Sequence, residues 1–242
     1  MPTQRTVLVI DGGGAPRGAL TQRLRRLGYR TLRAKSPEQA FQLVGERHQQ
    51  VAAALIPPDL AVIDLAAALA ALAAGAPDGI LSYIVAGPGP GPETLSELRT
   101  AGLALALWEP FDDARLRFQV NRALARFWDH PQRREPRAPI DAPALFFHAG
   151  RQKGARLYTL SAGGLFLETT RPAVRNAAVE VEIPVGPGSL RLPGSVLYTN
   201  VPGNLHRADL PVGMGVAFGA VAEPALAAIR REVAQVSLGL TL

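Results

Sequence analysis

The first half of the chain alternates short apolar runs with segments of helical periodicity. Apolar runs over residues 7–10, 29–34, 80–86 and 103–108 predict strands, and most of them are continuous, as expected when both faces of a strand are covered. Residues 18–27, 36–44, 93–101 and 112–128 carry apolar positions at helical spacing and predict helices. Such alternation predicts a doubly wound parallel sheet.

The third strand has two candidate positions. Residues 58–64 can form a strand that ends in Asp64, but the length remaining before Ile80 is then short for a helical crossover. Residues 51–56 fit the spacing better, and no aspartate then ends the strand. We favour the second alternative.

The second half has a different pattern. Residues 129–139 are rich in proline and charge and predict an extended linker. After it, apolar or alternating runs separated by Gly/Pro turns predict a small antiparallel barrel or sandwich, and Pro224 begins a helix with Leu226, Ile229 and Val233 on one face. The runs are residues 144–147, 154–160, 164–169, 179–183, 189–192, 194–199 and 212–218. The expected fold class is α/β plus all-β, with domains at 1–128 and 140–242 joined by linker 129–139.

Composition excludes several classes of chemistry. The 242 residues include no Cys, which excludes thiol catalysis and thiolate-bound zinc, and the four His are scattered without a helical pair. We expect no metal site and no catalytic residues, because nothing supplies a nucleophile and a base together.

Charge and hydropathy indicate which partners and which cellular location to expect. The formal charge of +6 is nearly all arginine, yet no basic run exceeds two residues, so general nucleic-acid binding is disfavoured. No secretion signal precedes Val7, and Pro57, Pro58, Asp59 and Asp64 interrupt the most apolar stretch. We expect a cytoplasmic protein without a membrane span.

Three short patterns in the first half are similar to response-regulator receiver domains: Val7-Leu-Val-Ile-Asp11, Leu27-Gly-Tyr-Arg-Thr-Leu32 and Trp108-Glu-Pro-Phe111. The resemblance implies an acidic Mg²⁺ site, a phosphoacceptor Asp and a nearby Lys. Gly12 follows Asp11 where a second carboxylate is usual, and Glu109 stands where the lysine belongs. We therefore expect a pseudo-receiver that docks a protein partner or forms a homodimer. The sequence leaves open whether Asp64 is a vestigial phosphoacceptor.

Three segments in the second half resemble PilZ domains, in the right order. Arg133-Arg-Glu-Pro-Arg137 supplies an RxxxR element, Thr159-Leu-Ser-Ala-Gly-Gly164 a [D/N]xSxxG-like element, and Gly213-Met-Gly-Val-Ala-Phe218 a late GMGxxF strand. The resemblance implies cyclic di-GMP as the ligand of a bacterial second-messenger receptor.

The ligand site implied by this resemblance consists of Arg133, Arg134, Arg137, Thr159, Ser161, Gly163 and Gly164. Arginine suits such a ligand because its planar fork pairs with guanine edges or phosphates and stacks on bases. Thr159 replaces the Asp/Asn that reads guanine in the family, at a cost of about 1.5–3 kcal/mol for a lost charge-assisted contact.

Two functions follow from these expectations. The first is a cyclic di-GMP effector in which nucleotide binding rearranges the domains and alters partner interaction. The alternative is a PilZ-fold adaptor that no longer binds the nucleotide and acts through protein contacts, for which Thr159 is the main support.

Overall fold

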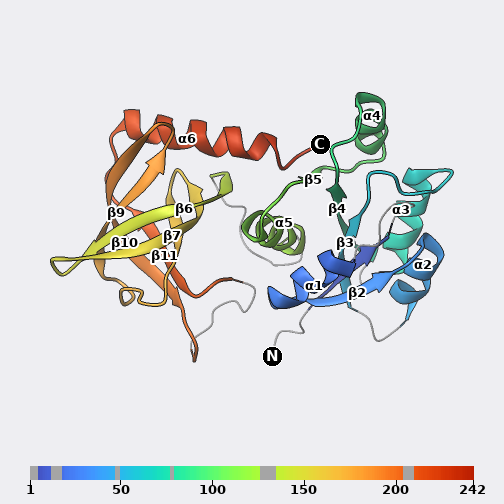
Figure 1. Ribbon diagram of the computed structural model, residues 1–242, viewed down its shortest axis with the longest axis horizontal. Coiled ribbons are helices and arrows are strands. Elements are labelled where there is room, and N and C mark those ends of the chain that lie inside the picture. The colour runs from blue at the N-terminus through green and yellow to red at the C-terminus, as the bar shows by residue number, and fades with distance from the viewer. Residues whose placement is uncertain (1–4, 12–17, 47–49, 77–78, 126–134, 204–209) are drawn as a thin grey trace. The chain divides into compact units, whose positions relative to one another are not determined.

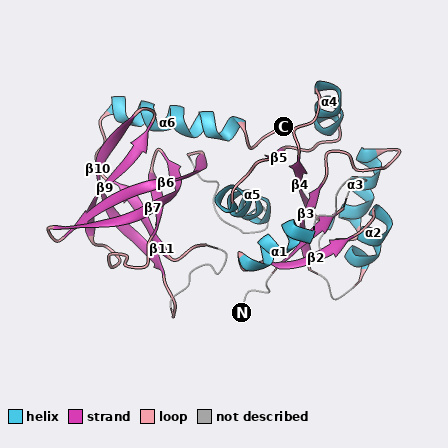
Figure 2. Ribbon diagram, in the orientation of Figure 1, coloured by secondary structure: helices cyan, strands magenta, loops and turns pink. Residues whose placement is uncertain are grey.

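The chain forms two compact units in a computed structural model that describes residues 5–11, 18–46, 50–76, 79–125, 135–203 and 210–242. Contacts divide it into a first unit of Met1–Asp129 with Gly239–Leu242 and a second unit of His130–Leu238. Figure 2 shows helices and strands mixed in the first unit, whereas strands dominate the second. In the described segments, no helix combines the length and apolar character needed to cross a membrane.

The first unit is built on a five-stranded parallel sheet with strand order β2-β1-β3-β4-β5 (Figure 1). Its strands are β1 (Thr6–Ile10), β2 (Arg30–Ala34), β3 (Val51–Ile56), β4 (Ser82–Gly87) and β5 (Leu105–Trp108). Its helices are α1 (Gly18–Arg26), α2 (Pro37–Gly45), α3 (Leu65–Ala74), α4 (Pro92–Thr100) and α5 (Asp113–Ala125). This is the receiver-like α/β fold that the sequence predicts.

Helices cover both faces of this sheet, which explains the continuous apolar strands. Buried residues of α2, α3 and α4 share one core cluster with residues of β1 and β3. Figure 1 shows α1 and α5 on the opposite face, where Leu24, Leu116 and Val120 are buried. All of β1 and β3 is therefore buried, as parallel strands between two helical layers must be.

The structure decides the position of the third strand. Val51–Ile56 pairs with β1 on one side and β4 on the other. Asp64 lies after the strand, exposed, and accepts a hydrogen bond from the Ala67 amide as the N-cap of α3. Ser36 caps α2 in the same way, as its position before Pro37 predicts. The expected end of the helix over residues 112–128 lies outside the described residues.

The second unit is a closed antiparallel barrel with strand order β10-β11-β8-β7-β6-β9 and a C-terminal helix (Figure 1). Its strands are β6 (Arg137–His148), β7 (Arg151–Ser161), β8 (Gly164–Glu168), β9 (Ala178–Val185), β10 (Gly188–Asn200) and β11 (Gly213–Phe218), followed by α6 (Glu223–Leu238). Two runs that the sequence separates at Pro193 form one strand, β10, because Pro193 pairs with Glu180 without ending it.

Two boundaries differ from the expected domains. β6 begins at Arg137, so the last residues of the expected linker 129–139 already pair with β7. At the other end, Gly239–Leu242 belong to the first unit, although the barrel domain was expected to extend over 140–242. Both differences arise from pairing between segments distant in the chain, which local patterns do not report.

One core cluster fills the barrel, and α6 contributes to it. Phe146, Leu157, Leu167 and Val181 are fully buried there, and Ile229 and Val233 of α6 join the same cluster. These two α6 residues are four apart and lie on one face of the helix. The helix therefore forms part of the barrel core.

Candidate functional site

The structure brings Arg137, Thr159 and Ser161 together at one end of the β6–β7 pair. Arg137 opposes Ser161 in the strand register. Its Nη1 donates to Thr159 Oγ1 at 3.0 Å and its Nη2 to Ser161 Oγ at 3.3 Å. Thr159 and Ser161 are two residues apart on one strand, so both hydroxyls face the same side, where one guanidinium reaches both. Two of the expected sequence elements thus meet.

The turn after Ser161 has its own internal bonds. Ser161 Oγ donates to the Gly164 carbonyl at 2.9 Å, and the Gly163 carbonyl accepts from the Phe218 amide at 3.1 Å. A Cβ on Gly164 would collide with the Val216 carbonyl of β11, whereas Gly163 is exposed with open space around its Cα. Gly164 is therefore required by strand packing, while Gly163 leaves its side of the turn accessible.

Thr159 does not point freely to solvent. It is 4% exposed, and its hydroxyl accepts from Arg137. Phe166 opposes it on β8 and is itself buried against Tyr158 and Tyr198. The Thr159 side chain thus acts in this structure as a partner that orients the arginine.

The RxxxR segment is described only from Glu135 onward. Arg133 and Arg134 lie outside the described residues. Glu135 reaches α6, where its Oε1 lies 3.6 Å from Nη2 of Arg230, and the same guanidinium binds Glu223 at 3.0 Å. A carboxylate between the two motif arginines is therefore tied to the C-terminal helix.

The other basic residues of β7 are exposed or half-buried, and they lie between the middle of the β6–β7 pair and its hairpin end. Arg156 pairs with Asp141, whose backbone is left-handed with a φ of 53° at the register shift in β6. Arg151 and Gln152 are exposed near the β6–β7 hairpin, next to Lys153. Arg151 opposes His148 at the hairpin end, whereas Arg137 opposes Ser161 at the other end, so Arg151 lies away from the candidate site.

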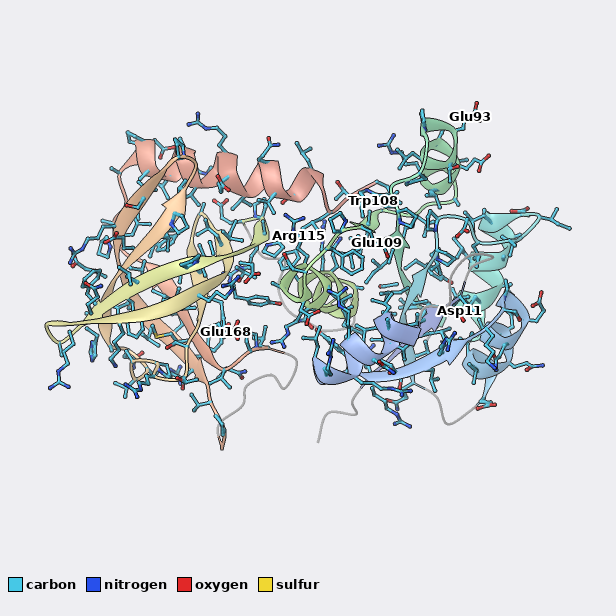
Figure 3. The ribbon with its side chains drawn as sticks, viewed as in Figure 1. Asp11, Glu93, Trp108, Glu109, Arg115 and Glu168 are labelled. Atoms are coloured by element: carbon cyan, nitrogen blue, oxygen red, sulfur yellow. The ribbon has the colours of Figure 1, made fainter. Side chains whose placement is uncertain are left out.

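A second candidate site lies at the carboxyl ends of β1 and β5, where Figure 3 labels Asp11 and Glu109. Asp11 is 8% exposed, and Arg33 from β2 binds its carboxylate through Nε at 3.1 Å and Nη2 at 2.5 Å. This hydrogen bonding raises the pKa of the Arg33 guanidinium. The charge that a metal ion would neutralise in a receiver is balanced here by an arginine.

The other residues that the structure describes at this edge differ from those of a receiver site. Pro57 and Pro58 follow β3, and Glu109 is exposed after β5. Over the described segments, no three His, Asp or Glu side chains are grouped as a metal-ligand set.

We expect the protein to remain unphosphorylated when incubated with Mg²⁺ and a small phosphodonor such as acetyl phosphate. No aspartate ends β3, and Arg33 competes with any cation for Asp11. Intact-mass spectrometry checks this, with an active receiver domain phosphorylated in parallel. A stoichiometric phosphoryl adduct on this chain would contradict the pseudo-receiver assignment.

Sequence patterns missed two structural features around the candidate site. The Glu135–Arg230 pair joins residues far apart in the chain, and no motif marks it. The aromatic cluster of Tyr158, Phe166 and Tyr198 lies over the glycines of β11: a Cβ on Gly215 would collide with the Tyr198 ring. The GMG pattern could have signalled close packing at this strand.

Comparison with known proteins gives a family match for the second half. Residues 131–235 match the PilZ domain. No curated protein matches the chain.

Solved structures match each half at low identity. The PilZ domain of YcgR from Escherichia coli with c-di-GMP is 20% identical, covering 45% of this chain and 93% of that one, with a TM-score of 0.34. The Bacillus subtilis inhibitor of motility (MotI/DgrA) is 13% identical over 45% of this chain, with a TM-score of 0.37, and only 53% of its own length is covered. A CheY-like receiver domain from Methanospirillum hungatei is 16% identical over 51% of this chain and 96% of that one, with a TM-score of 0.43. The family match places a PilZ domain at residues 131–235, and the residues before it form the five-stranded parallel α/β sheet described above.

Proposed function

We propose that this protein is a signalling effector that binds cyclic di-GMP through its PilZ domain. The observation that carries the proposal is the meeting of Arg137 with Thr159 and Ser161, which unites two separate motif segments at one end of the barrel. The PilZ family implies the ligand, and the chemistry of the site suits a dianionic guanine dinucleotide.

In the proposed complex, Arg137 stacks on a guanine or pairs with its edge, and Arg133 and Arg134 contact phosphate or the second guanine. Thr159 and Ser161 hold the Arg137 guanidinium in place, so that less rotamer entropy is lost when the ligand binds. The exposed Gly163 allows the ligand to approach the turn, while Gly164 maintains the packing of β8 on β11.

Thr159 sets the expected strength of binding. Without a carboxylate at this position, one charge-assisted contact to guanine N–H groups is lost, which corresponds to about a ten- to hundredfold weaker affinity. Because Thr159 orients Arg137 instead, part of the binding energy is retained through the arginine. We therefore propose a weakened but specific receptor.

Nucleotide binding to Arg133, Arg134 and Arg137 would alter how the receiver-like domain presents its surface to a protein partner. The Arg33–Asp11 ion pair supports a partner-docking role, because it balances a carboxylate that phosphotransfer would require. We place this activity in the cytoplasm and propose no catalytic step.

The competing function is a PilZ-fold adaptor without ligand. It is favoured by one observation: the Thr159 hydroxyl is already engaged by Arg137 in a nearly buried position. Calorimetric titration of cyclic di-GMP and, separately, GTP into the full chain distinguishes the two. Saturable heat with cyclic di-GMP alone supports the receptor, whereas no heat and no competition at high ligand concentration supports the adaptor.

A further inference from the structure

The outer face of the β7–β8 strand pair carries polar side chains beyond the candidate site. Leu165 and Leu167 of β8 belong to the barrel core, so Phe166 and Glu168, which alternate with them, point away from it. Phe166 opposes Thr159 on β7, and the side chains of directly opposed residues lie on the same face. Thr159 and Glu168 therefore share the outer face of this strand pair.

Glu168 lies close to the candidate site along this face. It is exposed and is labelled in Figure 3, and it follows Phe166 by two residues, which corresponds to about 7 Å along an extended strand. Arg137 reaches the same region from β6, because its Nη1 donates to Thr159 Oγ1 at 3.0 Å. A guanidinium and a carboxylate are thus presented on one face, at a spacing that one purine base can bridge.

The basic residue opposite Glu168 already has another acidic partner. Arg156 opposes Glu168 in the register, but its Nε donates to Oδ1 of Asp141 and its Nη2 to the Asp141 carbonyl at 3.2 Å. Among the residues that the structure describes, none forms a hydrogen bond or an ion pair with the Glu168 carboxylate. Arg156 therefore does not need Glu168 as its counter-ion, and both carboxylate oxygens can accept hydrogen bonds from a ligand.

A carboxylate at this position complements the part of a guanine that Thr159 does not bind. The N1–H and the 2-amino group of guanine are adjacent donors, and an ionised carboxylate offers two acceptor oxygens to them. The Thr159 hydroxyl is a single group, and it already accepts from Arg137. Arginine in turn pairs with the O6 and N7 acceptors of guanine. Arg137 and Glu168 together therefore match both the acceptors and the donors of one guanine base.

We propose that Glu168 is the specificity-determining residue of the nucleotide site and supplies the base-reading carboxylate that position 159 lacks. This inference rests on the function proposed above, because it assigns a role within the same site. In the complex, Arg137 binds O6 and N7 of one guanine, and the Glu168 carboxylate accepts from the N1–H and 2-amino groups of that base. The site then selects guanine over bases that lack these donors, and it recovers part of the affinity that is lost with Thr159.

Calorimetric titration of cyclic di-GMP into the full chain carrying Glu168→Gln tests this assignment. Glutamine has nearly the same size but loses the charge and one acceptor oxygen, so the affinity should fall by about ten- to a hundredfold. Removing a negative charge would by itself favour an anionic ligand, so a loss of affinity reports the lost hydrogen bonds.

Glu180→Gln is the matched control for this substitution. Glu180 is an exposed glutamate on another strand of the same barrel, β9, where it pairs with Arg191. The affinity of this variant for cyclic di-GMP should stay within about threefold of the wild type, because an exposed ion pair contributes little.

Cyclic di-IMP, in which hypoxanthine replaces guanine, tests base reading directly, because it lacks only the 2-amino groups. The wild type should bind it about tenfold more weakly than cyclic di-GMP, as expected for the loss of one charge-assisted hydrogen bond. In Glu168→Gln, the ratio between the affinities for the two ligands should fall below about threefold. A substitution that only loosened the barrel would weaken the binding of both ligands equally and would keep the wild-type ratio.

The outcomes separate the role of Glu168 from the receptor function. If the wild type binds cyclic di-GMP and Glu168→Gln leaves its affinity or the ratio between the two ligands unchanged, the role of Glu168 is overturned and the receptor function stays intact. Equal losses in Glu168→Gln and Glu180→Gln would also overturn this role, because they would show no dependence on position. No binding by the wild type would overturn the receptor function and the role of Glu168 together.

Discussion

Replacing Arg137 by alanine is expected to weaken cyclic di-GMP binding by about a hundredfold or more. Hydrogen bonds to a charged group contribute about 1.5–3 kcal/mol each, and in the proposed complex this guanidinium makes more than one contact with the nucleotide. Isothermal titration measures the loss. Folding should persist, because Arg137 is only partly buried and Ser161 keeps its bond to the Gly164 carbonyl.

Arg151→Ala is the matched control for this substitution. It removes the same charge from an exposed position on the neighbouring strand β7, away from the Thr159 and Ser161 hydroxyls. The affinity of this variant for cyclic di-GMP should stay within about threefold of the wild type, because an exposed charge away from the site acts mainly through screened long-range attraction. An equal loss of cyclic di-GMP affinity in both variants would mean that charge alone, and not the geometry at Arg137, accounts for binding.

Gly213→Ala is expected to destabilise the barrel by about 3 kcal/mol, near the upper end of the usual cost of overpacking. Its Cβ would collide with the Leu167 carbonyl and lie 2.9 Å from the Phe166 ring. The carbonyl is fixed in the β8–β11 pairing, so it cannot move aside as a flexible side chain would. Urea unfolding followed by amide exchange of β8 and β11 measures the change.

Gly154→Ala tests whether the effect comes from close packing. Gly154 also lies within a strand, but nothing is within 4 Å of a Cβ added there, and the residue is exposed. Its stability should change by less than about 1 kcal/mol, with a gain favoured because alanine restricts the unfolded chain. A loss at Gly154 as large as that at Gly213 would rule out the packing explanation.

The fold could be predicted from the sequence wherever local periodicity reflects burial. Continuous apolar runs predicted the parallel sheet of the first unit, and runs separated by Gly/Pro turns predicted the barrel. The spacing along the chain favoured Val51–Ile56 as the third strand. Local patterns did not predict that Pro193 lies inside a strand, because proline is usually excluded from strand interiors. They also did not predict the pairing of Gly239–Leu242 with β5, because the two segments are more than a hundred positions apart in the chain.

The candidate site was predictable to the extent that motifs name residues. The motifs name Arg137, Thr159 and Ser161, and the three side chains are in contact, while their role in ligand binding stays a prediction. The motif could not reveal that Thr159 is nearly buried and orients the arginine, because burial depends on the register of β6, β7 and β8. Likewise, the motif names the glycines of β11 but does not explain why glycine is needed there. The structure shows that β8 and the Tyr198 ring approach these positions too closely for a Cβ.

The most direct test of the receptor function is calorimetric titration of cyclic di-GMP into the wild type and into an Arg133→Ala/Arg137→Ala double variant. The account predicts saturable binding by the wild type and its loss in the variant, with both proteins folded. No binding by the wild type, or equal binding by both proteins, would contradict it.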